Sequence, residues 1–117
     1  MQSQEMNSLL RIFIGEDARF DGQPLYESIV LKAREQGLAG ATVLRGPMGF
    51  GHSSLLRTAK TLRLSGDLPV IVEVADTKEK IAAFVSVLEG MVKGGLVTLE
   101  EIRVVRYGRG EKQTSAV

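Results

Sequence analysis

The chain has 117 residues, of which 44% are hydrophobic and 25% are charged, a composition typical of one soluble globular domain. Its formal net charge is only +1, so any electrostatic attraction of a polyanion would have to be local. The absence of cysteine excludes disulfides, thiolate metal sites and a cysteine nucleophile, and the single histidine, His52, excludes a metal site built on several histidines. We expect a cytoplasmic protein, because the polar N-terminus lacks the apolar segment of a signal peptide and no apolar run could cross a bilayer.

The first half of the chain predicts a strand, a helix and a second strand. Residues 9–14 have the length and β-branched content of a strand, and a polar loop follows over 16–22. Pro24 suits the first turn of a helix, and Gly37 is a natural stop. A second strand is expected over 41–45. The apolar residues at helical spacing are Leu25, Ile29 and Ala33.

The second half repeats this order. Residues 70–75 predict a strand, and Asp76, with Glu79 three residues on, has the spacing of a capping box at a helix start. Gly94 and Gly95 are expected to end this helix, and residues 96–107 predict one or two extended segments. The expected buried stripe consists of Ile81, Phe84, Val85, Leu88 and Val92.

Two βαβ units with short connections predict an α+β, ferredoxin-like βαββαβ sandwich, in which both helices cover one face of a four-stranded antiparallel sheet. We expect a single domain over 9–109, flanked by tails at 1–8 and 110–117. The strands are apolar on both sides, since Phe13 alternates with Ile12 and Ile14. Two helices cannot cover both faces, so we expect self-association to bury the second face.

Residues 36–66 contain no Asp or Glu, yet carry several basic residues. Ser53 and Ser54 could cap a helical segment, on which Arg57, Lys60 and Arg63 would lie close together. Such a stripe is either the solvated face of a lid helix or a basic surface for a nucleotide, a nucleic acid or an acidic partner. Base-stacking aromatic residues are absent from 53–64, so we do not expect direct nucleic-acid binding.

The chain is not expected to be an enzyme, and we assign no catalytic and no metal-binding residue. His52 is interpreted as a solvated loop residue, with a ligand contact or a pH-sensitive hinge as the alternative. Ser53 and Ser54 lack the strand–turn–helix elbow that activates a serine nucleophile.

The glycines and the C-terminal arginines each allow two interpretations. Gly46, Gly49 and Gly51 lack the Walker A pattern, and they either supply positive φ or let the backbone approach a phosphate. Gly94 and Gly95 either stop a helix or form an anion-binding turn with Lys93. The C-terminal basic group is either solubilising or phosphate-binding; it consists of Arg103, Arg106 and Arg109.

Several motifs together resemble the PII signalling proteins. Residues 40–43, Gly-Ala-Thr-Val, followed by Gly-Phe-Gly at 49–51, resemble the PII strand that leads into the large T-loop. Residues 68–74 resemble the segment that returns from that loop, and residues 103–111 resemble the C-terminal strand. The similarity covers about residues 9–111. The Val-Leu-Arg-Gly and Gly-Phe-Gly motifs are most similar to a PII-like (GlnB-like) group, the domain-of-unknown-function family one-ninety.

The resemblance implies a homotrimer that binds a nucleotide or another small anionic effector between subunits. It also implies that a T-loop-like segment, 46–67, engages a target protein such as a membrane transporter. By analogy, the ligand-binding residues would be Thr42, Gly49, Gly51, Glu73, Lys93, Gly94, Gly95 and Arg106, and the partner-binding residues would be His52, Arg57, Lys60 and Arg63.

The chain also departs from the PII pattern. Only Lys93-Gly94-Gly95 remains of the PII Gly-Asp-Gly-Lys phosphate loop, and Gly108 stands where PII proteins carry an arginine. No tyrosine occurs between Tyr26 and Tyr107, so the uridylylated T-loop tyrosine has no counterpart. These departures leave open which effector binds, an adenine nucleotide or a smaller anion. They also leave a second function open, that of a ligand-independent interaction or accessory subunit, for example of a membrane transporter.

Overall fold

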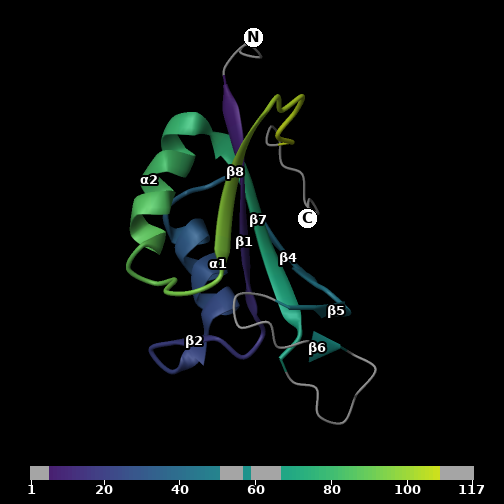
Figure 1. Ribbon diagram of the computed structural model, residues 1–117. Coiled ribbons are helices and arrows are strands. Elements are labelled where there is room, and N and C mark those ends of the chain that lie inside the picture. Colours follow the sequence, from purple (N-terminus) through teal and green to yellow (C-terminus); the bar gives the residue numbers. More distant parts are fainter. Residues whose placement is uncertain (1–5, 51–56, 59–66, 109–117) are drawn as a thin grey trace.

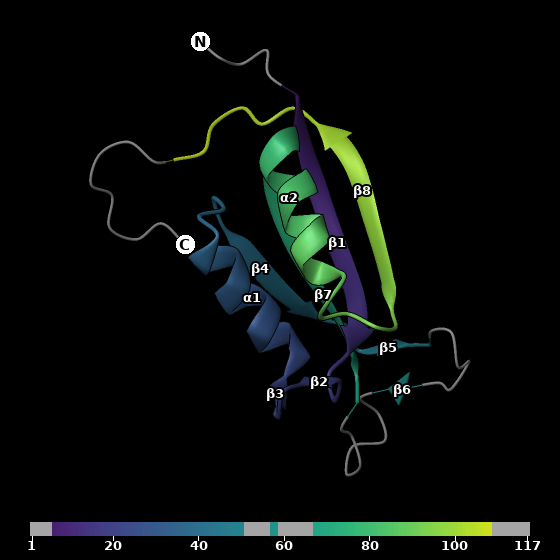
Figure 2. The same ribbon diagram turned by 90° about the vertical axis from the view of Figure 1, so that its left-hand side faces the viewer.

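Four strands form one antiparallel sheet, in the order β4-β7-β1-β8 (Figure 1). The structure is a computed structural model that describes residues 6–50, 57–58 and 67–108. Helices α1 (Leu25–Glu35) and α2 (Lys78–Leu88) both lie against one face of this sheet (Figure 2). The strands are β1 (Asn7–Gly15), β4 (Ala41–Arg45), β7 (Pro69–Thr77) and β8 (Leu96–Ile102). The predicted ferredoxin-like α+β architecture is therefore confirmed.

Two short hairpins were not predicted. Strand β2 (Arg19–Phe20) pairs with β3 (Gln23–Pro24), inside and just after the polar loop expected over 16–22. Asp21 and Gly22 connect them with φ angles of 51° and 81°, the left-handed values that a two-residue hairpin turn requires. The second hairpin pairs β5 (Met48–Gly49) with β6 (Arg57–Thr58).

Helix α1 begins and ends as the sequence predicts. Pro24 is its N-cap residue, with a φ of −57° that suits entry into a helix. Gly37 follows the C-cap with a φ of 77°, and the amides of Gly37 and Leu38 donate to the carbonyls of Arg34 and Ala33. This pair of hydrogen bonds is the Schellman arrangement, so glycine is needed here for its left-handed conformation.

The start of α2 corrects the predicted capping box. The N-cap is Thr77, whose hydroxyl accepts a hydrogen bond from the Lys80 amide at 3.2 Å. Asp76 is still part of β7 and is buried, and its carboxylate accepts from the amides of Ala39 and Thr77 at 2.8 and 2.7 Å. Asp76 therefore ties the α1–β4 connection to the end of β7 and does not cap the helix.

The end of α2 also differs from the prediction. The helix ends at Leu88, before the two glycines, and Met91 is buried in the turn that follows. Gly95 instead begins the entry into β8 with a φ of 85°, and a Cβ there would lie 2.5 Å from the Phe13 carbonyl oxygen. The glycine is needed because the backbone lies too close to the Phe13 carbonyl of β1 to leave room for a side chain.

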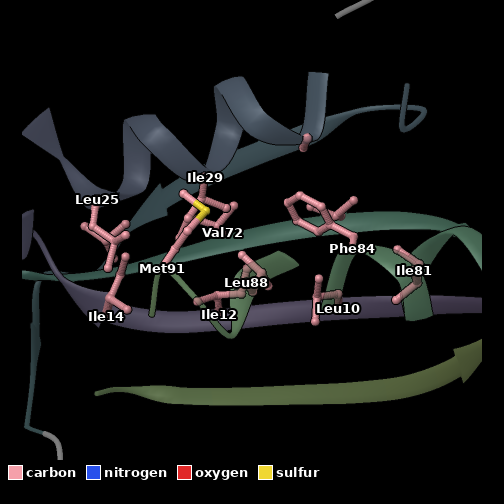
Figure 3. Close-up of a cluster of buried hydrophobic side chains, with 13 residues drawn as sticks. Leu10, Ile12, Ile14, Leu25, Ile29, Val72, Ile81, Phe84, Leu88 and Met91 are labelled. Atoms are coloured by element: carbon pink, nitrogen blue, oxygen red, sulfur yellow. The ribbon is translucent and has the colours of Figure 1, made fainter. Parts of the chain in front are cut away.

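The core lies between the helices and one face of the sheet (Figure 3). Phe84 of α2 is 1% exposed and packs among residues of both helices and of the central strands β1 and β7. Within the described residues, no helix is long and apolar enough to span a membrane. The buried apolar residues are Leu10, Ile12, Ile14, Leu25, Ile29, Ala33, Val70, Val72, Val74, Ile81, Phe84, Leu88 and Met91.

Candidate functional site: the open sheet face and the base of the 46–67 segment

The face of the sheet that carries no helix, here called the open face, is largely apolar. Alternation along the strands places Leu9 and Phe13 of β1 there, next to Ile71 of β7. The two edge strands contribute Leu44 and Leu96, which are 45% and 55% exposed. The sequence-based expectation of a second apolar face is therefore confirmed, while the partner that covers it stays a prediction.

One ion cluster crosses this face from the central strands β7 and β1 to the edge strand β8. Arg11 Nε donates to Glu73 Oε2 at 2.9 Å, and Arg11 Nη1 donates to Glu100 Oε1 at 3.0 Å. The hydrogen bond to Glu73, together with the charges of both carboxylates, raises the pKa of Arg11 above its usual value. We call these three residues the open-face ion cluster.

The cluster changes the interpretation of two predicted ligand-binding residues. Thr42 of β4 and Glu73 of β7 are register partners, so the structure brings them together on the open face. The Glu73 carboxylate, however, already accepts from Arg11. A ligand would have to share this carboxylate with Arg11 or displace the guanidinium.

The base of the 46–67 segment is a short hairpin stem. Gly49 pairs with Arg57, and the Gly46 amide donates to the Pro69 carbonyl at 2.8 Å. A Cβ at Gly46 or Gly49 would lie 3.2 or 3.1 Å from Pro69 Cγ, and neither glycine has a positive φ. Close packing against the Pro69 ring therefore accounts for these two glycines, and the interpretation by positive φ is wrong for them.

The hairpin also corrects the helix expected in this region. Arg57 and Thr58 are extended in β6, so the chain is not helical at the start of the predicted basic stripe. Seven other residues with predicted roles lie outside the described part of the chain: Gly51, His52, Ser53, Ser54, Lys60, Arg63 and Arg109.

Acidic residues at the β1–β2 turn hold both arms of this stem. The Glu16 carboxylate forms an ion pair with Arg45 at the end of β4, and the Glu16 amide donates to the Leu68 carbonyl at 2.8 Å. The Asp17 amide donates to Asp67 Oδ1 at 2.9 Å. Sequence reasoning missed these contacts because they join residues 29 to about 50 positions apart and have no local pattern.

The remaining predicted ligand residues are widely separated. Lys93 and Gly94 lie in the turn before β8, and no residue in the described ranges accepts a hydrogen bond from the Lys93 ammonium group. Arg106 lies beyond the other end of β8, close in sequence to Tyr107, whose hydroxyl accepts from Asn7 Nδ2 at 2.8 Å. Gly49 belongs to the separate β5–β6 hairpin and packs against Pro69 at the start of the central strand β7. Among the described residues, no side-chain hydrogen bond or ion pair joins Gly49, Lys93 and Arg106.

The residues that the structure describes include no group of three or more His, Asp or Glu side chains placed to hold an ion.

The fold matches solved structures of PII-like proteins. CPII from Thiomonas intermedia K12, a nitrogen regulatory PII-like protein bound to ADP, AMP and bicarbonate, superposes with a TM-score of 0.63. The match covers 86% of this chain and 90% of CPII at 16% sequence identity. A second CPII structure, bound to ADP and bicarbonate, gives a TM-score of 0.64 at 17% identity with the same coverage. At these identities the likeness establishes a PII-like fold.

Closer relatives are found by sequence. A UPF0166 protein of Aquifex aeolicus is 43% identical over 97 residues, which cover 83% of this chain and 91% of the relative. A UPF0166 protein of Methanocaldococcus jannaschii is 31% identical over 99 residues, which cover 84% of this chain and 91% of the relative. The model of the DUF190 family, described as "Uncharacterized ACR", matches residues 7–104. With this match over most of its length, and with the PII-like fold, the chain belongs to the DUF190 family.

Proposed function

We propose that this protein is a non-catalytic, cytoplasmic PII-like regulator that binds a small anionic effector between subunits of a homotrimer. The observation that carries the proposal is the β5–β6 stem at the end of β4, where the PII resemblance places the root of a target-binding loop. The 46–67 segment engages a target protein, such as a membrane transporter, and effector binding controls that contact.

The effector site lies between subunits, as the PII resemblance implies. Gly49 belongs to the β5–β6 hairpin and the Lys93–Gly95 turn leads into β8, and a second copy contributes one of these two segments to each site. Lys93 would contribute a cation, and Gly94 leaves open space for a ligand because no atom lies within 4 Å of a Cβ placed there. The other residues of the proposed site are Thr42, Gly51, Glu73, Gly95 and Arg106.

Adenine nucleotides and bicarbonate are the first effectors to test, since CPII carries them on the same fold. Isothermal titration calorimetry on the full chain would use ATP, ADP, AMP, a cyclic nucleotide and bicarbonate, singly and in pairs. We expect at least one to bind. The Lys93→Gln variant should weaken that binding by about tenfold, as expected for one lost charge-assisted hydrogen bond. Lys32→Gln on α1 is the matched control. The absence of binding heat for the whole panel would contradict the proposal.

Exposed apolar residues on the stem favour the second candidate, a ligand-independent interaction subunit. Met48 is half-exposed and Phe50 is 69% exposed, and such side chains are typical of protein contacts. Charge reversal of Arg57 and Lys60 separates the candidates. If capture of the target protein is lost while effector has no influence on capture by the wild type, the interaction subunit is the better description.

A further inference from the structure

We propose that the open-face ion cluster sets the register in which a second copy of this chain packs on the open face, and that the partner's Arg103 supplies the counter-charge to Glu100. The proposal rests on the self-association that is part of the proposed function. The new part of the proposal is the set of residues that decides how the two copies are aligned.

The position of the cluster favours an interface. Arg11 lies on central strand β1 with apolar Leu9 and Phe13 two residues to either side on the same face. Glu73 lies on the other central strand, next to Ile71. Arg11 and Glu73, on the two central strands, become the most desolvated part of any complex formed there, whereas Glu100 on the edge strand β8 lies nearer the rim.

The charges of the cluster do not balance. Arg11 contacts both carboxylates, so one positive charge faces two negative charges and one negative charge remains. The excess is carried by the more exposed carboxylate, because the Glu100 side chain is 54% exposed and that of Glu73 is 31% exposed. Burial of this face would leave Glu100 in need of a cation from the covering molecule.

A second copy of the chain offers such a cation. Arg103 directly follows β8, three residues beyond Glu100 on the same edge of the sheet, and it is exposed. Among the described residues, no side chain pairs with its guanidinium. Because every copy carries both Glu100 and Arg103, each interface in a closed assembly can form the same pair.

The physical role of such a pair is selection of one register. An apolar face alone tolerates several packings, whereas any packing that buries Glu100 without a cation is penalised by the cost of an unpaired buried charge. The open-face ion cluster therefore disfavours misaligned assemblies, and it need not increase the total affinity.

A double-mutant cycle on the full chain tests the pair. Glu100→Gln keeps an acceptor for Arg11 and removes the excess charge, while Arg103→Gln removes the proposed cation. Sedimentation equilibrium should show a dissociation constant raised by about tenfold in each single variant, and the double variant should be no weaker than either single. Lys32→Gln, a surface lysine on α1, is the control and should match the wild type. Independent, additive effects, or no effect, would overturn the pairing.

Native mass spectrometry of two further variants tests the cluster itself. Arg11→Met leaves two carboxylates without their cation and should raise the dissociation constant by about 100-fold. The triple variant Arg11→Met, Glu73→Met and Glu100→Met should associate again, but in more than one stoichiometry. An Arg11→Met protein that assembles like the wild type, or a triple variant with a single size, would contradict the proposal.

The same samples separate this inference from the proposed function. A wild type that assembles but binds none of the effectors in the calorimetric panel would contradict the proposed function and leave the cluster's role standing. If the wild type binds ADP but the effects of the Glu100 and Arg103 variants on the dissociation constant add independently, only the inference is contradicted.

Discussion

The two faces of the sheet are built from the same four strands and differ in what covers them. On the helix side, alternate residues of β1 and β7 such as Ile12 and Val72 are fully buried against α1 and α2. On the open face their neighbours Arg11 and Glu73 form ion pairs that are partly exposed. The first face holds one chain together, and we propose that the second holds chains to one another. The variants below test this division, from the largest expected effect to the smallest.

Truncation in the core should cost the most. Phe84→Ala removes a large buried side chain from the helix side and should lower the free energy of unfolding by about 3–5 kcal/mol. Urea denaturation followed by circular dichroism measures this change. Leu31→Ala, an exposed position on α1, is the matched control and should change stability by less than about 0.5 kcal/mol. Equal effects of the two variants would break the assignment of the core.

Gly95→Ala should be the next most damaging. The φ of 85° disfavours any side chain, and the new Cβ would meet the Phe13 carbonyl oxygen, so we expect a loss of about 2–4 kcal/mol in unfolding free energy. Gly94→Ala is the control, because its Cβ would meet nothing within 4 Å. If Gly94→Ala destabilised the protein as strongly, the contact with β1 would not be the cause.

The corrected helix cap predicts a smaller effect. Thr77→Ala removes the side chain that accepts from Lys80 and should lower the free energy of unfolding by about 1 kcal/mol, as seen by thermal or urea denaturation. Glu79→Ala should have a weaker effect, since Glu79 is not the partner in a capping box headed by Asp76. A larger loss of stability for Glu79→Ala than for Thr77→Ala would support the original prediction of a capping box formed by Asp76 and Glu79.

The ion pair at the base of the 46–67 segment should contribute least to stability. Arg45→Gln removes the partner of Glu16, and because the Arg45 side chain is largely exposed, the change should be within about 1 kcal/mol and should shrink as salt rises. Lys32→Gln, which breaks the exposed pair with Glu35, provides the comparison. A loss that is large and independent of salt would show that this contact is more than a surface ion pair.

The sequence predicted the architecture because its main signals are local. Alternating strands, the helical spacing of Leu25, Ile29 and Ala33, and the stop at Gly37 each depend on a few neighbouring residues. The boundaries of α2 were less accurate, because Asp76 satisfies its carboxylate through a tertiary contact with Ala39 that no local pattern reveals. The same holds for Gly95, whose role depends on the passage of the chain over Phe13.

The candidate site was harder to predict, because its residues meet only through the sheet register. Glu73 was predicted as a ligand residue from the PII resemblance alone, whereas its pairing with Arg11 follows from β1 lying beside β7. Glu16 and Asp67 gave no signal in the sequence, since their contacts at the base of the 46–67 segment join distant positions. The proposed effector residues stay predictions, because Lys93 and Arg106 lie beyond opposite ends of β8 and Gly51 lies outside the described residues.

The most direct test of the division between the two faces is the mass of the wild-type protein in solution. Sedimentation equilibrium of the full chain at micromolar concentrations and physiological salt measures this mass without any variant. We predict a single species with the mass of a homotrimer, three times 12.7 kDa, that dissociates only on strong dilution. A folded, stable monomer over the whole concentration range would contradict the assignment of the open face as an assembly surface.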